Sequence, residues 1–164
     1  MKLVIQRVTR AEVRVDGAVV GRIGTGMLVL VGLERGDGDA QLERAAHRLT
    51  TLRIFEDDGG KINRGLDEVG GGLLLVSQFT LAGSIRRGRR PSFDAAMPAD
   101  EAQPLFARFV ERLRADGLTV ETGSFGALME VELVNDGPVT LLWDDPPGMP
   151  NRRVERPDHP IFNG

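Results

Sequence analysis

Two long apolar runs constrain what this chain can fold into. They are MLVLVGL at residues 27–33 and LLLVSQF at residues 73–79, and each follows a glycine-rich turn. Apolar runs that do not alternate with polar residues are typical of strands whose two faces are both covered. We therefore expect two central strands in a sheet that other elements cover.

Imperfect alternation of apolar and polar residues predicts more strands in the N-terminal part of the chain. They are expected at residues 2–8, 11–16 and 18–23, and the Asp16-Gly17 pair is a typical hairpin turn before the third. A further short strand is expected around Ile54 and Phe55.

Two helices are expected from apolar residues that recur at helical spacing. The first starts at an N-cap, Asp39, and carries an apolar stripe made of Leu42, Ala45, Ala46, Leu49 and Leu52. The second runs from Asp100 to about Asp116, and Gly117 ends it. Many strands with two helices indicate an α/β or α+β fold.

A hairpin is expected near the end of the folded part of the chain. Met129, Val131 and Leu133 share one face of a half-exposed strand, and the segment 139–143 is expected to pair with it across an NDG turn. Pro138 follows that turn directly, where a strand normally needs a backbone N–H. On the pattern alone, it is a proline at the first position of an edge strand, which sheets tolerate.

A chain of 164 residues is expected to form a single domain. Residues 1–144 are expected to form it, and residues 145–164 are a tail rich in proline and arginine without periodicity. No signal sequence or membrane-spanning run is visible, so a cytoplasmic location without a membrane partner is expected. The net charge of −3 argues against a general nucleic-acid coat but allows a local basic patch.

The chain contains few of the side chains that usually carry catalysis. It has no cysteine and two histidines, His47 on the first expected helix and His159 in the tail. A Ser-His-Asp triad is therefore disfavoured, and no spacing of ligands predicts a metal site. No G-x-G-x-x-G or G-x-x-x-x-G-K-[ST] pattern exists, so no nucleotide cofactor is predicted either.

The end of the second apolar run is a candidate site. In SQFTL the strand ends in three hydrogen-bonding side chains, Ser77, Gln78 and Thr80. They indicate either a pocket at the end of a buried strand or a strand that simply exits to solvent.

A basic loop starts five residues after SQFTL. It contains four arginines around one glycine, namely Arg86, Arg87, Arg89 and Arg90. Guanidinium groups bind phosphate through paired N–H donors, so the loop suits the end of a nucleic acid or a phosphorylated substrate. A solvated loop without a ligand is the alternative.

Two separated motifs carry a family resemblance. SQFTL at 77–81 and NDGPVT at 135–140 resemble the signature of D-aminoacyl-tRNA deacylases. Supporting matches are IQRVTRA at 5–11, RPSF at 90–93, FVER at 109–112 and the TG-x-FGA-x-M segment at 122–129. The resemblance covers roughly residues 1–143. It implies one α/β domain with mixed, largely antiparallel sheets, a barrel-like core and two main helices.

The resemblance also implies an activity. Members of this family are homodimers that hydrolyse the ester between a D-amino acid, or glycine mischarged on tRNA(Ala), and the 3′-terminal adenosine of tRNA. They spare L-aminoacyl-tRNA. The Gly137-Pro138 peptide is expected to be cis and to enter the partner subunit's pocket, where its carbonyls face the α-amino group and leave no room for an L side chain. No metal or cofactor is implied.

Individual roles follow from the same resemblance. Ser77, Gln78 and Phe79 are expected near the substrate, and the backbone around Phe79 and Thr80 is expected to polarise the ester carbonyl. Thr80 also matches a position regarded as a nucleophile.

Other matched positions concern the tRNA and the loop. Phe125 and Met129 are expected beside the terminal adenine, and Arg7 is expected to support the Gly-Pro peptide. The expected tRNA-binding residues are Arg87 and Arg90, which match the family, and Arg86 and Arg89, which add charge beyond it.

Two mechanisms and three functions stay open. An aminoacyl ester is already activated, so positioning and oxyanion stabilisation can suffice without histidine, cysteine or metal. This favours assistance by the ribose 2′-hydroxyl over attack by Thr80, because nothing obvious would deprotonate Thr80. The other functions are a non-catalytic tRNA-binding module that uses the arginine loop and a hydrolase of small esters.

Overall fold

The computed structural model describes residues 1–86 and 88–148, which contain a six-stranded mixed sheet and two α-helices. The sheet strands are β1 (Lys2–Val15), β2 (Ala18–Ile23), β3 (Gly26–Gly32), β6 (Gly72–Ser77), β7 (Thr119–Thr122) and β8 (Glu130–Asp144). A separate small hairpin and the helices are β4 (Phe55–Glu56), β5 (Ile62–Arg64), α1 (Asp39–Thr51), the 3-10 helix η1 (Phe79–Ala82) and α2 (Ala99–Ala115). The strand order is β2-β1-β3-β6-β7 with β8 also paired to β1, and contacts between β2 and β7 nearly close the sheet into a barrel.

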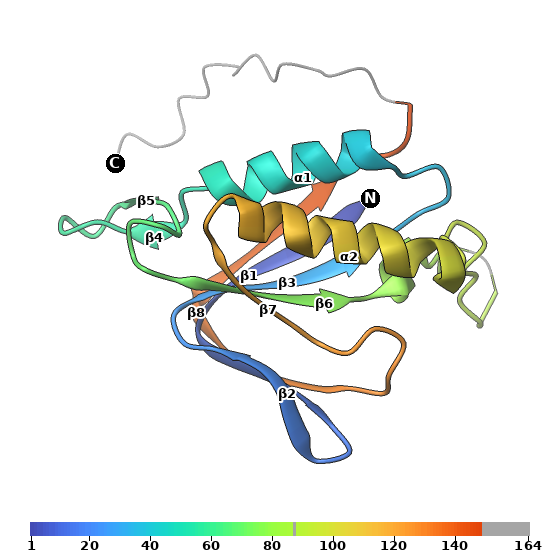
Figure 1. The fold of residues 1–164 in the computed structure, drawn as a ribbon, viewed down its shortest axis with the longest axis horizontal. Helices are drawn as coiled ribbons and strands as arrows, with labels where there is room; N and C mark the ends of the chain where they lie inside the picture. The colour runs from blue at the N-terminus through green and yellow to red at the C-terminus, as the bar shows by residue number, and fades with distance from the viewer. Residues whose placement is uncertain (87, 149–164) are drawn as a thin grey trace.

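The two central strands are β3 and β6, and both of their faces are buried, as the apolar runs predict. Leu73 and Leu75 pack in the core beneath α1 and α2, whereas Leu74 and Val76 pack in a second core inside the curled sheet. Figure 1 shows both helices on one face of the sheet. The expected α/β class, with two main helices and a barrel-like core, is confirmed.

Several boundaries differ from the expected ones. The first two expected strands form one continuous strand, β1, because β8 pairs along nearly its whole length. Helix α1 contains Asp39 but its N-cap is Gly38, and Pro98 rather than Asp100 caps α2. Strands β5 and β7 are too short to produce a recognisable alternation, and they were not predicted.

The prediction of a hairpin near the C-terminus is wrong. Both of its halves belong to β8, which runs antiparallel to β1, with Asn135 opposite Val8 and Thr140 opposite Gln6. The four residues between them face a single residue of β1, Arg7, and form a bulged loop. NDG is a typical turn signal, but β1 offers one long edge that accepts both halves, so the chain continues in the same direction.

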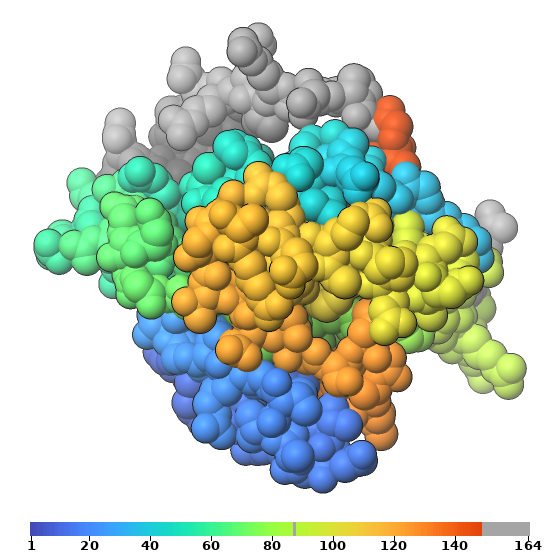
Figure 2. All heavy atoms as spheres, in the orientation of Figure 1, coloured from blue at the N-terminus to red at the C-terminus, as the bar shows by residue number. Residues whose placement is uncertain are grey.

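The helices form a continuous layer over the sheet, and the β1–β2 hairpin projects beyond it (Figure 2). Within the described ranges, no helix is both long enough and apolar enough to cross a membrane. The expected tail at 145–164 lies outside the described residues from position 149 onward.

Candidate functional site

Three parallel strands end at the same edge of the sheet. Strand β6 is parallel to both β3 and β7, with Ser77 opposite Val31 and Leu75 opposite Thr122. At this edge β6 leads directly into η1 (Figure 1). Ligands of α/β sheets bind beyond the carboxyl ends of parallel strands, so this edge is the candidate site.

The SQFTL motif forms the turn from β6 into η1. The Gln78 N–H donates to the Val31 carbonyl (2.7 Å), and the Leu81 N–H donates to the Gln78 carbonyl (3.2 Å). Gly32 of β3 permits this turn, because a Cβ at that position would lie 2.7 Å from the Leu81 Cβ. The chain thereby leaves the buried sheet and brings Thr80 to the surface.

The Thr80 hydroxyl has an amide as its side-chain partner. The Gln78 Nε2 donates to the Thr80 Oγ1, and an amide is too weak a base to take the hydroxyl proton. His47 lies elsewhere, in a hollow of about 530 Å³ beside α1 and α2 that Glu43 and Arg112 also line. The site therefore offers hydrogen-bonding groups, while the structure places no strong base against Thr80 among the described residues.

An aromatic pair borders these polar groups. Phe79 is 58% exposed, and its ring lies edge-to-face against Phe93 with centroids 5.2 Å apart. Ser77 is half-buried at the last position of β6. The pair gives the otherwise polar edge an apolar wall.

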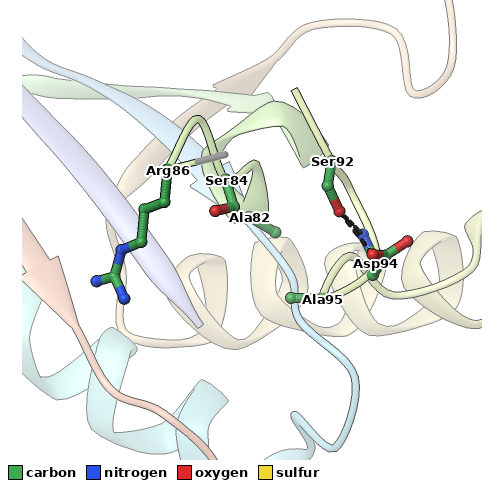
Figure 3. A pocket seen from close by; sticks show the side chains of 6 residues that line it. All are labelled: Ala82, Ser84, Arg86, Ser92, Asp94 and Ala95. Atoms are coloured by element: carbon green, nitrogen blue, oxygen red, sulfur yellow. Dashed lines mark hydrogen bonds between the residues drawn. The ribbon is translucent and has the colours of Figure 1, made fainter. Parts of the chain in front are cut away.

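The basic loop follows η1 and closes beside the site. Ser84 and Ser92 exchange two backbone hydrogen bonds (2.7 and 2.9 Å) that tie the ends of the loop together. Three of the four expected arginines, Arg86, Arg89 and Arg90, are exposed, whereas Arg87 lies outside the described residues. A hollow of about 520 Å³ borders the loop and is lined by Ala82, Ser84, Arg86, Ser92, Asp94 and Ala95 (Figure 3). Cationic groups therefore stand next to the open side of the site.

Phe125 lies in the loop after β7, at the same edge as η1. Its ring packs against Phe106 of α2 with centroids 6.0 Å apart. Met129 directly precedes β8 and packs against the second core. Both side chains are half-buried, so each keeps part of its surface accessible to a ligand.

Residues 136–139, called the Gly-Pro loop below, form the bulge within β8. The Gly137-Pro138 peptide bond is cis, and both residues are exposed. Gly137 has a φ of 132°, and a Cβ there would lie 2.9 Å from the Val139 Cγ2. Only glycine fits this position without displacement of its neighbours.

Arg7 supports the Gly-Pro loop from β1, where it is 4% exposed. Its Nε donates to the Asp136 carbonyl (2.9 Å), and its Nη1 donates to the Ile54 carbonyl (2.7 Å). The Asp136 and Glu56 carboxylates lie 3.2 and 3.7 Å from the guanidinium. The guanidinium therefore ties the loop to β1 and to the segment before β4.

Sequence reasoning missed two residues of these regions, Phe93 and Asn135. Phe93 belongs to the RPSF segment, but nothing in that segment indicates an aromatic contact with Phe79. The Asn135 Oδ1 accepts the Val139 N–H across the Gly-Pro loop (2.7 Å). The tendency of asparagine to bond nearby backbone in turns was the available signal.

A single chain does not bring the two motif regions together. The Gly-Pro loop faces Arg7, which pairs with Met27 of β3, whereas η1 packs on Gly32 of the same strand. The five residue-to-residue steps from Met27 to Gly32 span about 17 Å of extended strand. The Gly-Pro loop therefore lies far from Thr80 of its own chain.

Ion pairs hold β8 to β1 on both sides of the Gly-Pro loop. Hydrogen bonds from Arg10 and then Arg14 lower the pKa of the Glu132 carboxyl. At the other end, a hydrogen bond to Asp144 raises the pKa of Lys2 (Nζ–Oδ2 2.7 Å). In the part of the chain that the structure describes, no group of three His, Cys, Asp or Glu side chains is placed to hold a metal.

A protein-family model described as D-Tyr-tRNA(Tyr) deacylase matches residues 4–144. The chain belongs to this deacylase family. A relative from Symbiobacterium thermophilum, named D-aminoacyl-tRNA deacylase, is 58% identical over 144 residues, which cover 88% of this chain and 95% of the relative. The match to the deacylase family includes both η1 and the Gly-Pro loop.

Solved structures resemble the whole deacylase domain. One, described as a c-Myc DNA unwinding element binding protein, is 40% identical with a TM-score of 0.84, and the match covers 89% of this chain and 99% of the other. A second, described as a probable eukaryotic D-amino acid tRNA deacylase, is 22% identical with a TM-score of 0.72, and the match covers 88% and 98%. At 22% identity the likeness supports the fold alone.

Proposed function

We propose that this protein hydrolyses the ester bond of D-aminoacyl-tRNA and releases free tRNA and the D-amino acid. The observation that carries the proposal is the presence of the polar η1 edge and the Gly-Pro loop in one member of a deacylase family. Relatives at 58% and 56% identity are named D-aminoacyl-tRNA deacylases. We place the reaction in the cytoplasm, where aminoacyl-tRNA is used.

A homodimer completes the site in this proposal. Because the Gly-Pro loop lies about 17 Å from η1 along β3, the loop that enters one site has to come from a second copy. Among the described residues, strand β8 pairs with β1 alone, and apolar side chains on or next to β8 are exposed: Leu128, Val131, Val134, Leu141 and Leu142. An edge strand with such side chains is a typical surface for association.

The Gly-Pro loop acts as the chiral filter. It presents backbone rather than a side chain at its tip, since Gly137 has none and Pro138 is a compact ring. A backbone wall beside the substrate Cα excludes one enantiomer by steric clash and does not read the identity of the side chain. We therefore expect activity toward many D-amino acids and toward glycyl-tRNA(Ala), and exclusion of L-aminoacyl-tRNA.

The chemistry is assisted by the tRNA itself. The Thr80 hydroxyl is paired with the Gln78 amide, which does not activate it as a nucleophile. The N–H groups of Phe79 and Thr80 precede the first hydrogen bond of η1, so they can stabilise the oxyanion that forms. The ribose 2′-hydroxyl next to the ester then assists the attack of water, and Ser77 helps to hold the substrate.

The rest of the 3′ end lies along the same edge. Phe125 and Met129 contact the terminal adenine with their accessible surfaces, and Phe79 borders the ester. The tRNA phosphates contact the basic loop, through Arg86, Arg87, Arg89 and Arg90. This arrangement matches apolar surface to the base and cationic surface to the backbone.

The test compares D-Tyr-tRNA with L-Tyr-tRNA at equal concentrations. Purified protein should release tyrosine from the D form and leave the L form at its spontaneous hydrolysis rate. Equal rates on the two substrates would reject the proposal.

The exposed basic loop also favours a second candidate, a non-catalytic tRNA-binding module. This candidate predicts salt-dependent tRNA binding without turnover, and binding that survives substitution of Gly137. A hydrolase of small esters differs from both, because replacement of the loop arginines would leave its activity unchanged.

A further inference from the structure

Part of the Gly-Pro loop has no partner in β1, because four residues of β8 face one residue there. We propose that Asn135 is a positioning residue, which takes the place of the missing strand and fixes the direction of the Gly137-Pro138 peptide. The effect on chiral selectivity rests on the proposed function, whereas the contacts themselves do not.

The Asn135 side chain bonds both main-chain groups of Val139. Its Oδ1 accepts the Val139 N–H (2.7 Å), and its Nδ2 donates to the Val139 carbonyl (3.2 Å) and to the Thr140 Oγ1 (3.1 Å). A primary amide carries an acceptor and two donors in one plane, like a peptide group. The side chain therefore supplies the pair of bonds that a facing residue of β1 gives to a regular antiparallel strand.

No other side chain reproduces both bonds at this distance. Ionised aspartate keeps the acceptor but places a negative charge against the Val139 carbonyl. Glutamine adds a methylene group that moves the amide, and serine is too short to reach both groups. The requirement is therefore for asparagine itself, beyond the general preference of turns for this residue.

Asn135 and Arg7 together hold both ends of the Gly-Pro loop. Arg7 bonds the Asp136 carbonyl at its start, and Asn135 bonds Val139 at its end. Only the exposed Gly137-Pro138 peptide lies between these anchors. A displacement of about 1 Å in a group that positions substrate can lower a rate about 100-fold, so the anchors set how well the filter works.

The contact can be tested without an activity assay, by amide hydrogen exchange at Val139. Asn135→Ala is compared with wild type and with Asn63→Ala, which removes an exposed asparagine of β5. We expect Asn135→Ala alone to lose protection at Val139, by at least about tenfold, while the amides of β3 stay protected. Unchanged exchange at Val139 would overturn the proposal.

Selectivity is then measured on D- and L-Tyr-tRNA. Asn135→Ala should lower kcat on the D substrate at least about tenfold with little change in KM, because the tRNA contacts lie elsewhere. Asn63→Ala should behave as wild type. If Asn135→Ala keeps the wild-type kcat and D-to-L ratio although Val139 exchanges faster, Asn135 is merely structural and the proposal fails.

The isosteric variant Asn135→Asp adds a pH signature and serves where Asn135→Ala does not fold. A protonated carboxyl regains a donor, whereas an ionised one has none. The kcat of Asn135→Asp relative to wild type should therefore rise as pH falls, while the ratio for Asn135→Ala stays flat. A flat ratio for Asn135→Asp contradicts the donor role. If wild type does not distinguish D from L, the proposed function fails, and Val139 exchange still decides the contact.

Discussion

The two ends of the sheet are built in opposite ways. The backbone on both sides of the Gly137-Pro138 peptide is held by side chains of its own chain, with Arg7 on Asp136 and Asn135 on Val139. At the η1 end, Thr80 and Phe79 are exposed, the Thr80 hydroxyl accepts from the Gln78 amide, and the Phe79 ring packs against Phe93. The Gly-Pro loop, called the projection below, is therefore anchored by its own chain, whereas the η1 edge, called the receptor below, is open to solvent. This contrast supports the homodimer proposed above.

The largest effect on activity is expected at Gly137, where the Gly-Pro loop has no space for a Cβ. Gly137→Ala places a Cβ 2.9 Å from the Val139 Cγ2 and 3.2 Å from the Arg7 Nη2. Turnover of D-Tyr-tRNA should fall by about 100-fold or more, because the loop has to shift. Steady-state kinetics on purified protein measures this.

The matched control for Gly137→Ala is Gly60→Ala. Gly60 also has a positive φ (74°), but its Cβ would meet no neighbour within 4 Å. This control should lose about 1–2 kcal/mol of stability and no activity. Comparable activity losses in both variants would show that backbone strain alone, rather than the shape of the loop, is responsible.

The next largest effect concerns the support of the projection. Arg7→Met leaves the buried Ile54 carbonyl and the Asp136 carbonyl without their donor, at a cost of about 1–3 kcal/mol. A loss of about 2 kcal/mol in loop positioning corresponds to about a 30-fold lower kcat/KM. Thermal unfolding and kinetics together measure both consequences.

The control for Arg7→Met is Arg53→Met, which removes an exposed arginine that donates to the Asn63 carbonyl. It should change neither quantity. Wild-type activity in Arg7→Met, despite a lower melting temperature, would mean that the projection does not need this support.

A smaller effect on activity is expected at the basic loop that follows η1. Replacement of Arg86, Arg89 and Arg90 by glutamine should raise KM for tRNA about tenfold. It should also flatten the dependence of log KM on log salt, by a slope of roughly 0.7–0.9 for each phosphate that is no longer neutralised. The value of kcat should stay the same, because these side chains do not hold the loop.

A charge-matched control for the basic loop replaces Arg48, Arg53 and Arg108 by glutamine, since these arginines are exposed elsewhere on the molecule. KM for tRNA should then stay near the wild-type value. An equal rise in KM in both triple variants would indicate general charge rather than a local tRNA contact.

The smallest change in activity is expected at Thr80. Thr80→Val keeps the branched shape and removes a neutral hydroxyl, which is worth about 1 kcal/mol as a hydrogen-bonding group. Activity should fall less than about fivefold in single-turnover measurements if the ribose hydroxyl assists the reaction. Complete loss of turnover in a folded variant would make Thr80 the nucleophile.

One substitution, at Glu132, should change the stability of the fold and leave activity unchanged. Hydrogen bonds from Arg10 and Arg14 lower the pKa of Glu132, so this carboxylate stabilises the fold above its ordinary pKa, and the contribution is lost as pH falls through the lowered value. Glu132→Gln should therefore lower the melting temperature at neutral pH, with a difference that disappears in acid. Activity should be unchanged in this variant.

The receptor end was predictable because its causes are local. The strand from Leu73 to Val76 is buried on both faces, so its sequence is a continuous apolar run, and polar residues follow where burial stops. Parallel pairing to β3 then places Ser77 and Gln78 at the edge of the sheet that is the candidate site. The contact between Phe79 and Phe93 depends on how the basic loop folds back, and the spacing of apolar residues in the sequence does not predict this.

The projection end was mispredicted because its causes are distant in sequence. NDG has the composition of a hairpin turn, and only the pairing of β8 with β1, more than a hundred residues away, makes it a bulge. The role of Asn135 depends on the lack of a facing residue in β1, and the sequence around Asn135 does not predict that lack. Motif resemblance pointed to Gly137, Pro138 and the supporting Arg7, but it gave no role to Asn135.

The separation of the two motifs along β3 has a genetic consequence. A chain with a damaging substitution in the Gly-Pro loop still has an intact η1 edge, and a chain with a damaging substitution in η1 still has an intact Gly-Pro loop. In the proposed two-fold dimer, built from one chain of each kind, the two defects fall into the same site, and the other site is assembled from undamaged parts. Two alleles that are each inactive alone should therefore restore activity when expressed together, whereas two alleles damaged at the same end should not.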